Sequence, residues 1–184
     1  MDRFGKTPPP ALGGNPGTYE ERLAQWFLEG TFFRDFVHRN PSGKGGKGEL
    51  ADAVVLYGDV VLMVQVKAQT SERDPIAWAR KHLAKAAHQL RGTDRMLSEG
   101  HVTELQSDTL GPVAFDSAKY RYKHGLIVVA HASQPYSADE ICRELAAFTF
   151  PIHVLSLDDF VLLSERMDTA GDLIPYLDLR YELR

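Results

Sequence analysis

The segment from Leu50 to Lys67 constrains the fold most strongly, because it holds two apolar runs separated by a Gly-Asp pair. The runs Leu50–Tyr57 and Val60–Lys67 are rich in valine, leucine and aromatic residues. A two-residue Gly-Asp separation between such runs is typical of a β-hairpin. Both faces of each run are apolar along most of their length, so we expect the hairpin to lie inside a sheet that is covered on both sides.

The turn sets the register of this hairpin. If Gly and Asp form the turn, Tyr57 faces Val60 and, further along the ladder, Asp52 faces Gln65. Opposed residues share a face, with Cβ atoms about 4.5–5.5 Å apart, and Lys67 follows Gln65 on that face. An amide inside an apolar strand must also be hydrogen-bonded. The register therefore predicts that Asp52, Gln65 and Lys67 converge on one patch, provided that the ladder has no bulge.

These three side chains suit phosphodiester hydrolysis. Asp52 and the carbonyl oxygen of Gln65 are hard ligands of the kind that Mg²⁺ (or Mn²⁺) takes together with waters and phosphate oxygens. Lys67 can stabilise negative charge at phosphorus, or orient or deprotonate the attacking water. The alternative is structural: Asp52 follows a polar loop at the start of a strand, and Lys67 extends its ammonium into water at the end of one.

The rest of the chain alternates helices and strands. Thr18 to Phe33 has apolar residues at three- and four-residue intervals, with Thr18 as N-cap, and this predicts an amphipathic helix. Ile76 to about Leu90 predicts a second helix with a basic outer face. The other expected elements are strands at Phe36–His38, His124–His131 and Ile152–Leu155, and helices at Ser137–Phe148, from Ser156 to Leu163, and from Thr169 with a kink at Pro175. This order predicts an α/β layer domain with a mixed sheet.

The length of 184 residues suits one domain. Residues 1–17 combine Pro and Gly without an apolar period, so we expect a flexible leader followed by a single domain over residues 18–184. No apolar stretch approaches the length of a bilayer span and no secretory leader is apparent, which predicts a cytoplasmic protein without a membrane partner. The single cysteine, Cys142, excludes an internal disulfide.

Charge is distributed unevenly along the chain. Residues 1–100 carry 14 Lys and Arg against 12 Asp and Glu, and residues 101–184 carry 7 against 13. A nucleic-acid contact is therefore expected in the first part. The candidate contacts are Lys44 and Lys47 in the basic loop Asn40–Gly48, and Lys81, Lys85, His88 and Arg91 on the second helix. The alternative for the helix is an ordinary solvated face, and the loop lacks the spacing of a phosphate-binding P-loop.

The arrangement Glu20 … Asp52 … Gln65-Val66-Lys67 resembles the PD-(D/E)XK nuclease superfamily. The nearest resemblance is to restriction-type branches, in which the third position is often Gln. In "TYEERLAQWFLEG", Tyr19-Glu20 and a closing Gly occupy the places that those branches give to an aromatic-Glu pair and a glycine. The stretch "GELADAVVLYGDVVLMVQVKAQ" is also similar to nuclease-related domains, which have a Glu three residues before the Asp.

The resemblance implies a Mg²⁺-dependent DNA nuclease, in a defence or repair system, with a catalytic core at about residues 18–95. It implies a restriction-endonuclease-like three-layer fold, in which a mixed sheet with a central hairpin is flanked by helices. Asp52 would be the principal metal ligand, Gln65 the second ligand and Lys67 the catalytic lysine, while Glu20 would reach the metal or its water. Glu20 is preferred to its neighbour Glu21 because it lies on the inward side of the helix. Glu49 is a reserve ligand, and neutral Gln65 stands where many members carry an acid.

Two other functions remain open from the sequence. One is a degenerate nuclease-like module that binds nucleic acid or a protein partner, and the other is an α/β protein in which the polar residues are structural. Zinc hydrolase and serine hydrolase motifs are missing from the sequence. A nuclease that cuts both strands of a duplex would do so most simply as a homodimer with two sites.

Overall fold

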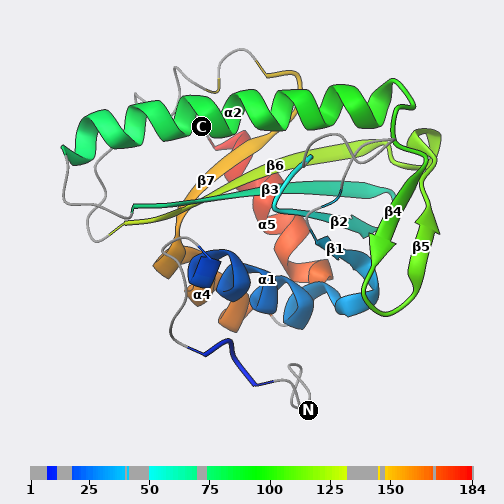
Figure 1. Cartoon of the computed structure of the whole chain (residues 1–184), viewed down its shortest axis with the longest axis horizontal. Coiled ribbons are helices and arrows are strands. Elements are labelled where there is room, and N and C mark those ends of the chain that lie inside the picture. The colour runs from blue at the N-terminus through cyan, green and yellow to red at the C-terminus, as the bar shows by residue number, and fades with distance from the viewer. Residues whose placement is uncertain are drawn as a thin grey trace.

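The computed structural model of the chain describes residues 8–11, 18–39, 41, 50–69, 74–131, 145, 148–167 and 169–183. Over these residues the protein is an α/β domain with a five-stranded mixed sheet between helices (Figure 1). In the order of the sheet the strands are β1 (Val37–Arg39), β2 (Ala53–Tyr57), β3 (Val60–Ala68), β6 (Tyr122–Ala130) and β7 (Ile152–Ser156). Strands β1, β2 and β3 pair antiparallel in that order, and β6 and β7 continue the sheet parallel to β3. The predicted α/β alternation with a mixed sheet is confirmed.

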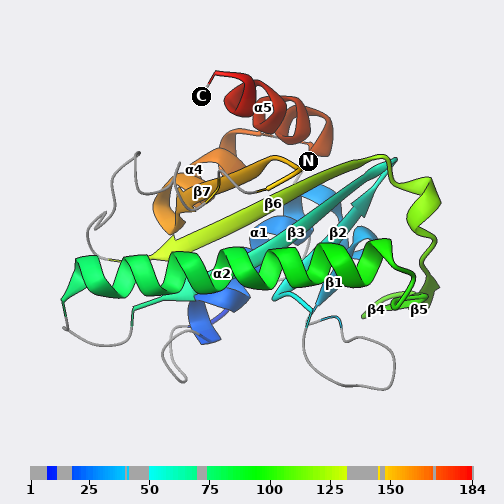
Figure 2. The ribbon, with the colours of Figure 1, turned by 90° about the horizontal axis from the view of Figure 1, so that it is seen from above.

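The sheet is covered on both faces, as the apolar character of the hairpin predicts. Helices α1 (Thr18–Phe32), α4 (Leu157–Arg166) and α5 (Ala170–Glu182) pack on one face with Leu62 and Val64 of β3. Helix α2 (Pro75–Ser98) lies across the other face with Val61 and Met63, and it runs along the sheet when the molecule is seen from above (Figure 2). Alternate residues of β3 therefore belong to different layers.

Polar caps begin three of the helices. Asp74 accepts hydrogen bonds from the amides of the second and third residues of α2. Ser156 accepts from the amide of Asp159 at 3.0 Å, and Thr169 forms a capping box with Asp172. Both of the caps predicted for the last two helices are confirmed, and each satisfies backbone groups that the first turn of a helix leaves unpaired.

Several boundaries differ from the sequence prediction. Helix α2 continues to Ser98 instead of ending near Leu90, because Thr93 bonds the carbonyls of Leu50 and Gln89 and Leu97 is buried in the core. Strand β2 begins at Ala53 rather than at residue 50, and the first edge strand lies one residue later than predicted. A two-stranded sheet, β4 (Glu104–Ser107) and β5 (Gly111–Ala114), occupies a segment for which no helix or strand was predicted.

Some expectations concern residues outside the described ranges. These are most of the leader at residues 1–17, most of the basic loop at 40–48, and most of the helix expected at 137–148. None of the described helices combines the length and the apolarity that crossing a membrane requires.

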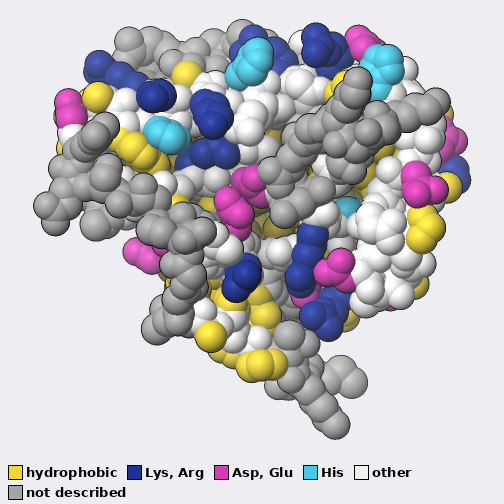
Figure 3. Space-filling view, in the orientation of Figure 1, with side chains coloured by type: hydrophobic (Ala, Val, Ile, Leu, Met, Phe, Trp, Pro, Cys, Tyr) yellow, Lys and Arg dark blue, Asp and Glu magenta, His cyan; other side chains and the backbone are white. Residues whose placement is uncertain are grey.

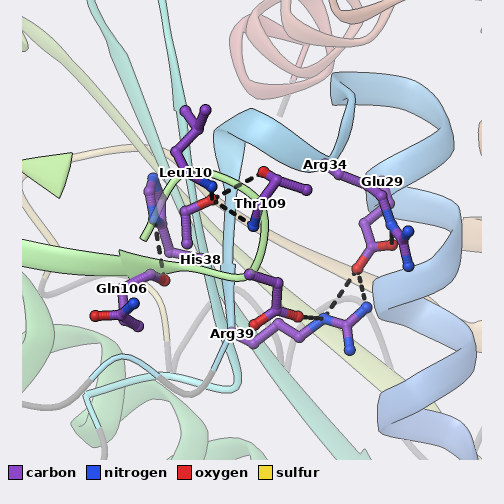
Figure 4. Close-up of polar contacts among 9 residues, drawn as sticks. Glu29, Arg34, His38, Arg39, Gln106, Thr109 and Leu110 are labelled. Atoms are coloured by element: carbon purple, nitrogen blue, oxygen red, sulfur yellow. Dashed lines mark hydrogen bonds and ion pairs between the residues drawn. The ribbon is translucent and has the colours of Figure 1, made fainter. Parts of the chain in front are cut away.

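The buried carboxylate of Glu29 on α1 forms ion pairs that link this helix to the edge strand β1 (Figure 4). Its two oxygens accept hydrogen bonds from Arg34 and Arg39, each at 2.9 Å from the guanidinium Nε. Arg39 also pairs with Asp108 in the loop between β4 and β5, and Thr109 of that loop donates to the Asp35 carboxylate at 2.6 Å. The short strand β1 is thereby held between α1 and the β4–β5 hairpin.

Candidate active site

The β2–β3 hairpin has the predicted register over all of β2. Gly58 adopts a φ of +59°, the left-handed conformation that a two-residue hairpin turn requires and glycine tolerates. Tyr57 pairs with Val60 at the turn, and Ala53 pairs with Val64 at the far end. Asp52 and Gln65 therefore lie at the same end of the hairpin, away from the turn.

Asp52 lies just before β2, where the ladder departs from regular pairing. Its amide donates to the carbonyl of Val64, which is already the partner of Ala53. Two consecutive residues thus face one, as they do in a β-bulge. The Asp52 carboxylate accepts a hydrogen bond from the Val66 amide, so the side chain caps the ladder where backbone pairing stops.

Gln65 and Lys67 project toward the α2 layer, like Met63 before them. The Lys67 ammonium donates to Gln65 Oε1 at 2.7 Å and lies 3.8 Å from Asp52 Oδ2. Gln65 is 1% exposed, and the side chains of Lys67 and Asp52 are 13% and 15% exposed. We call these three residues the Asp52 cluster. The predicted convergence of the three side chains is present, but the predicted pairing of Asp52 with Gln65 is wrong, because Asp52 bonds the carbonyl of Val64 instead.

Burial raises the pKa of Asp52 above its ordinary value. Lys67, the Val66 amide and Lys85 oppose this rise, in decreasing order of effect, because each favours the ionised carboxylate. Lys85 belongs to α2, so the helix contributes positive charge to the Asp52 cluster. A buried carboxylate among fixed cations is a common feature of catalytic and metal-binding sites.

The pKa of His82, also on α2, is affected by the same cations. Burial lowers its pKa first, and Lys81, Lys85 and Lys67 lower it further. The Lys67 contribution shows that His82 and the Asp52 cluster are within electrostatic reach of each other. The ordinary pKa of histidine is 6.5, and the pKa of His82 is lower, so this imidazole is mostly uncharged near neutral pH.

The Asp52 cluster lies toward the carboxyl ends of the parallel strands β3 and β6. Lys67 is paired with Val129, and the Gln69 amide donates to the carbonyl of Ala130 beyond them. In open α/β sheets, ligands bind outside the carboxyl ends of the strands. The position of the cluster in the sheet is therefore typical of a binding site.

Cationic side chains cover the outer side of α2 beside this edge. Figure 3 shows Lys, Arg and His side chains gathered over the helix. The exposed members are Arg80, Lys81, Lys85, His88, Arg91 and Arg95. Between Asp74 and Asp94 the helix sequence has no acidic residue, and Asp94 itself is paired with Lys123. Lys81, Lys85 and Arg91 thus lie where the sequence predicted them, while Lys44 and Lys47 are outside the described residues.

Glu20 is carried by a different layer from the Asp52 cluster. It lies half-buried in the first turn of α1, which packs on the sheet face opposite to α2, whereas Glu21 is exposed. Its role toward a metal therefore stays a prediction. The reserve ligand Glu49 is outside the described residues.

The donor atoms of the Asp52 cluster fit a hard divalent cation that keeps most of its water. The cluster offers one carboxylate and one amide carbonyl, and Mg²⁺ is typically held by one or two carboxylates together with waters and substrate phosphates. Within the described residues, no group of three or more His, Cys, Asp and Glu side chains is arranged for a metal. A metal here would therefore depend on Asp52, on Gln65 and on oxygen atoms of the substrate.

Three side chains on α2, those of Trp78, His82 and Gln89, were missed by the sequence prediction, which named only Lys85 among them. Trp78, His82, Lys85 and Gln89 follow one another at helical spacing along the side of α2 nearest the cluster, and this spacing was the available signal. Gln89 lies between Lys85, which acts on Asp52, and Thr93, which bonds the Leu50 carbonyl. Its buried Oε1 is without a hydrogen-bond partner in the described structure.

The chain matches no model of a protein family. A search of curated proteins gives no significant match. The function of the site must therefore be inferred from its geometry and chemistry.

Proposed function

We propose that the protein is a metal-dependent nuclease that hydrolyses phosphodiester bonds of DNA. The observation that carries this proposal is the convergence of Asp52, Gln65 and Lys67 at the carboxyl edge of β3, beside a helix with a basic outer side. A carboxylate, an amide oxygen and an ammonium at one place match the needs of phosphodiester hydrolysis.

Each residue of the cluster has a role in this proposal. Asp52 and Gln65 would hold Mg²⁺ or Mn²⁺, and Glu20 would be the helix-borne carboxylate that reaches the metal or its water. When bound, the metal supplies Lewis-acid stabilisation and a more acidic water. Lys67 stabilises the negative charge that develops on the phosphoryl oxygens, since its ammonium is nearly buried and therefore poorly screened.

The surrounding fold and charge support the same proposal. A mixed sheet with α1 on one face and α2 on the other is compatible with a restriction-endonuclease-like three-layer core, in defence or repair. Lys81, Lys85 and Arg91 contact the phosphate backbone, and Lys44 and Lys47 extend these contacts from the loop. Two such chains in a homodimer would cut both strands of a duplex.

One observation favours a second candidate, a degenerate nuclease-like module that binds nucleic acid or a protein partner. Gln65 brings no negative charge, and its carbonyl oxygen already accepts a hydrogen bond from Lys67. The metal site then has a single acidic group from the cluster, and weak metal binding would leave binding without hydrolysis.

A plasmid-nicking assay in Mg²⁺ or Mn²⁺ separates the two functions. The variants are Lys67→Ala in the cluster and Lys119→Ala as a matched control on the short helix η2 (Ser117–Lys119). If the protein is a nuclease, wild type and Lys119→Ala nick the plasmid and Lys67→Ala does not. Plasmid left intact by all three proteins would contradict the nuclease and support the module.

A further inference from the structure

Three aromatic rings pack against one another beside the Asp52 cluster. Trp78 and His82 are one turn apart on α2, with ring centroids 4.6 Å apart and planes 21° from parallel. His131, the residue after β6, lies against the same indole at 5.5 Å and 44°. We call these three residues the ring stack. It joins α2 to the carboxyl edge of the sheet.

The register of the sheet places this stack close to Lys67. Lys67 pairs with Val129 of β6, and His131 lies two residues beyond Val129 in the chain. With strands about 4.8 Å apart and a rise of about 3.3 Å per residue, the backbones of His131 and Lys67 are about 8 Å apart. That separation is close to the distance between one nucleotide and the next in an extended chain, which makes the stack a neighbour of any phosphodiester held at the cluster.

The chemistry of the stack suits a base rather than an ordinary side chain. All three residues are half-buried, so part of each side chain remains accessible to solvent. The His82 imidazole is held in its neutral form by burial and by nearby lysines, and a neutral ring stacks without repelling those cations. The exposed cations Lys81 and Lys85 lie near the rings, since both lower the pKa of His82. A flat ring surface bordered by positive charge matches a nucleotide, which joins a flat base to an anionic phosphate.

We propose that the ring stack of Trp78, His82 and His131 binds an unpaired nucleobase next to the phosphodiester at the Asp52 cluster. This inference rests on the proposed nuclease function for the place of the phosphodiester. A base inside a duplex already stacks on its neighbours, so a base that meets protein rings belongs to a single strand, a strand end or a flipped nucleotide. The substrate class is therefore DNA with unpaired bases beside the bond that is cut.

The test measures binding without cleavage. In buffer with a chelator, the affinities for three labelled DNAs of equal length are compared: an oligothymidylate, the same backbone with abasic residues, and a fully paired duplex. We expect wild type to bind the thymidylate about tenfold more tightly than the abasic strand. In Trp78→Leu, which keeps apolar bulk but removes the ring, the ratio should fall to near one.

Trp26 provides a matched control, because it lies on α1 and packs edge-on against Phe27 on the other face of the sheet. Trp26→Phe should keep the base preference, and it leaves Trp78 as the single tryptophan of the chain. The fluorescence of Trp78 should then be quenched by the thymidylate and not by the abasic strand. If Trp78→Leu fails to fold, as judged by thermal unfolding, His82→Ala and His131→Ala serve the same comparison.

Equal affinities of wild type for the thymidylate and the abasic strand would overturn the inference. A base preference unchanged in Trp78→Leu, or tighter binding of the paired duplex than of the single strand, would do so as well. These outcomes are independent of the nuclease proposal. Base preference without nicking removes the nuclease alone, and nicking without base preference removes the ring stack alone.

Discussion

The ammonium of Lys67 donates a hydrogen bond to the side-chain carbonyl of Gln65 at 2.7 Å. The same nitrogen lies 3.8 Å from the Asp52 carboxylate, so one cationic group is within reach of both oxygens that we propose as metal ligands. A divalent cation that uses these oxygens must displace or repel the ammonium. Lys67 is thus expected to oppose metal binding in the resting site and to assist once a phosphate is present.

Replacing Lys67 by Met should therefore separate metal binding from catalysis. The apolar side chain keeps a similar length but leaves both oxygens to the metal, so Mn²⁺ should bind more tightly than to wild type. Nicking should fall by about 10²-fold, because the charge that stabilises the phosphoryl oxygens is gone. Calorimetric titration with Mn²⁺ measures the first effect, and the plasmid assay measures the second. Weaker Mn²⁺ binding in Lys67→Met would contradict this antagonism.

Gln65→Glu should lower the Mg²⁺ concentration needed for half-maximal nicking. The substitution places a second carboxylate beside Asp52, and two negative ligands hold a divalent cation more tightly than one. Gln65→Leu is the matched variant, since it removes the oxygen without adding charge, and it should raise the requirement for Mg²⁺. An identical Mg²⁺ dependence in both variants would show that Gln65 is not a ligand.

Local sequence chemistry was sufficient to predict the core of this site. The Gly58-Asp59 turn and the two apolar runs define the register, and the observed pairing of Ala53 with Val64 follows from them. The predicted caps at Ser156 and Thr169 also form, because capping depends on residues only a few positions apart.

Features that depend on tertiary contacts were not predictable in the same way. The bond from Thr93 to the Leu50 carbonyl helps carry α2 past Gly92, although glycine is a poor helix former. The irregular pairing at Asp52 breaks the period of two on which the register depends. Glu20 was expected near the metal from the resemblance alone, because helical periodicity does not determine which face of a sheet a helix covers.

Asp52 has both a structural and a catalytic role to test. Asp52→Ala leaves the Val66 amide without its side-chain acceptor, and this should lower the free energy of unfolding by about 1–3 kcal/mol. Asp52→Asn keeps an acceptor oxygen and removes a charge that burial disfavours, so it should be near wild type in stability. Both variants should lose nicking. Chemical denaturation measures the stabilities, and equal losses in the two variants would exclude the capping role.

Neutralising the basic side of α2 should weaken DNA binding in a salt-dependent manner. Each phosphate contact that is lost lowers the slope of log affinity against log salt by about 0.9 for duplex DNA. Lys85→Gln with Arg91→Gln should therefore reduce the slope by roughly two. Lys119→Gln with Arg166→Gln, at sites away from α2, serves as the control and should leave the slope unchanged. An unchanged slope in the α2 variant would place the phosphates elsewhere.

The stability of the fold should fall in mild acid because of His124. This residue lies on β6 and is 2% exposed. Its ring stacks on that of His153, with His124 Nδ1 3.4 Å from His153 Nε2. Its Nε2 lies 3.4 Å from the Asp178 carboxylate. Burial lowers its pKa below the ordinary 6.5, and Asp178 opposes this only in part. The unfolded chain therefore binds the proton more readily, so the stability that neutral His124 contributes is complete above pH 6.5 and is lost as the pH falls through the lower, folded pKa. Thermal unfolding from pH 7.5 to about 5 should show this loss in wild type and a flatter profile in His124→Gln. Parallel profiles for the two proteins would assign the acid sensitivity to other groups.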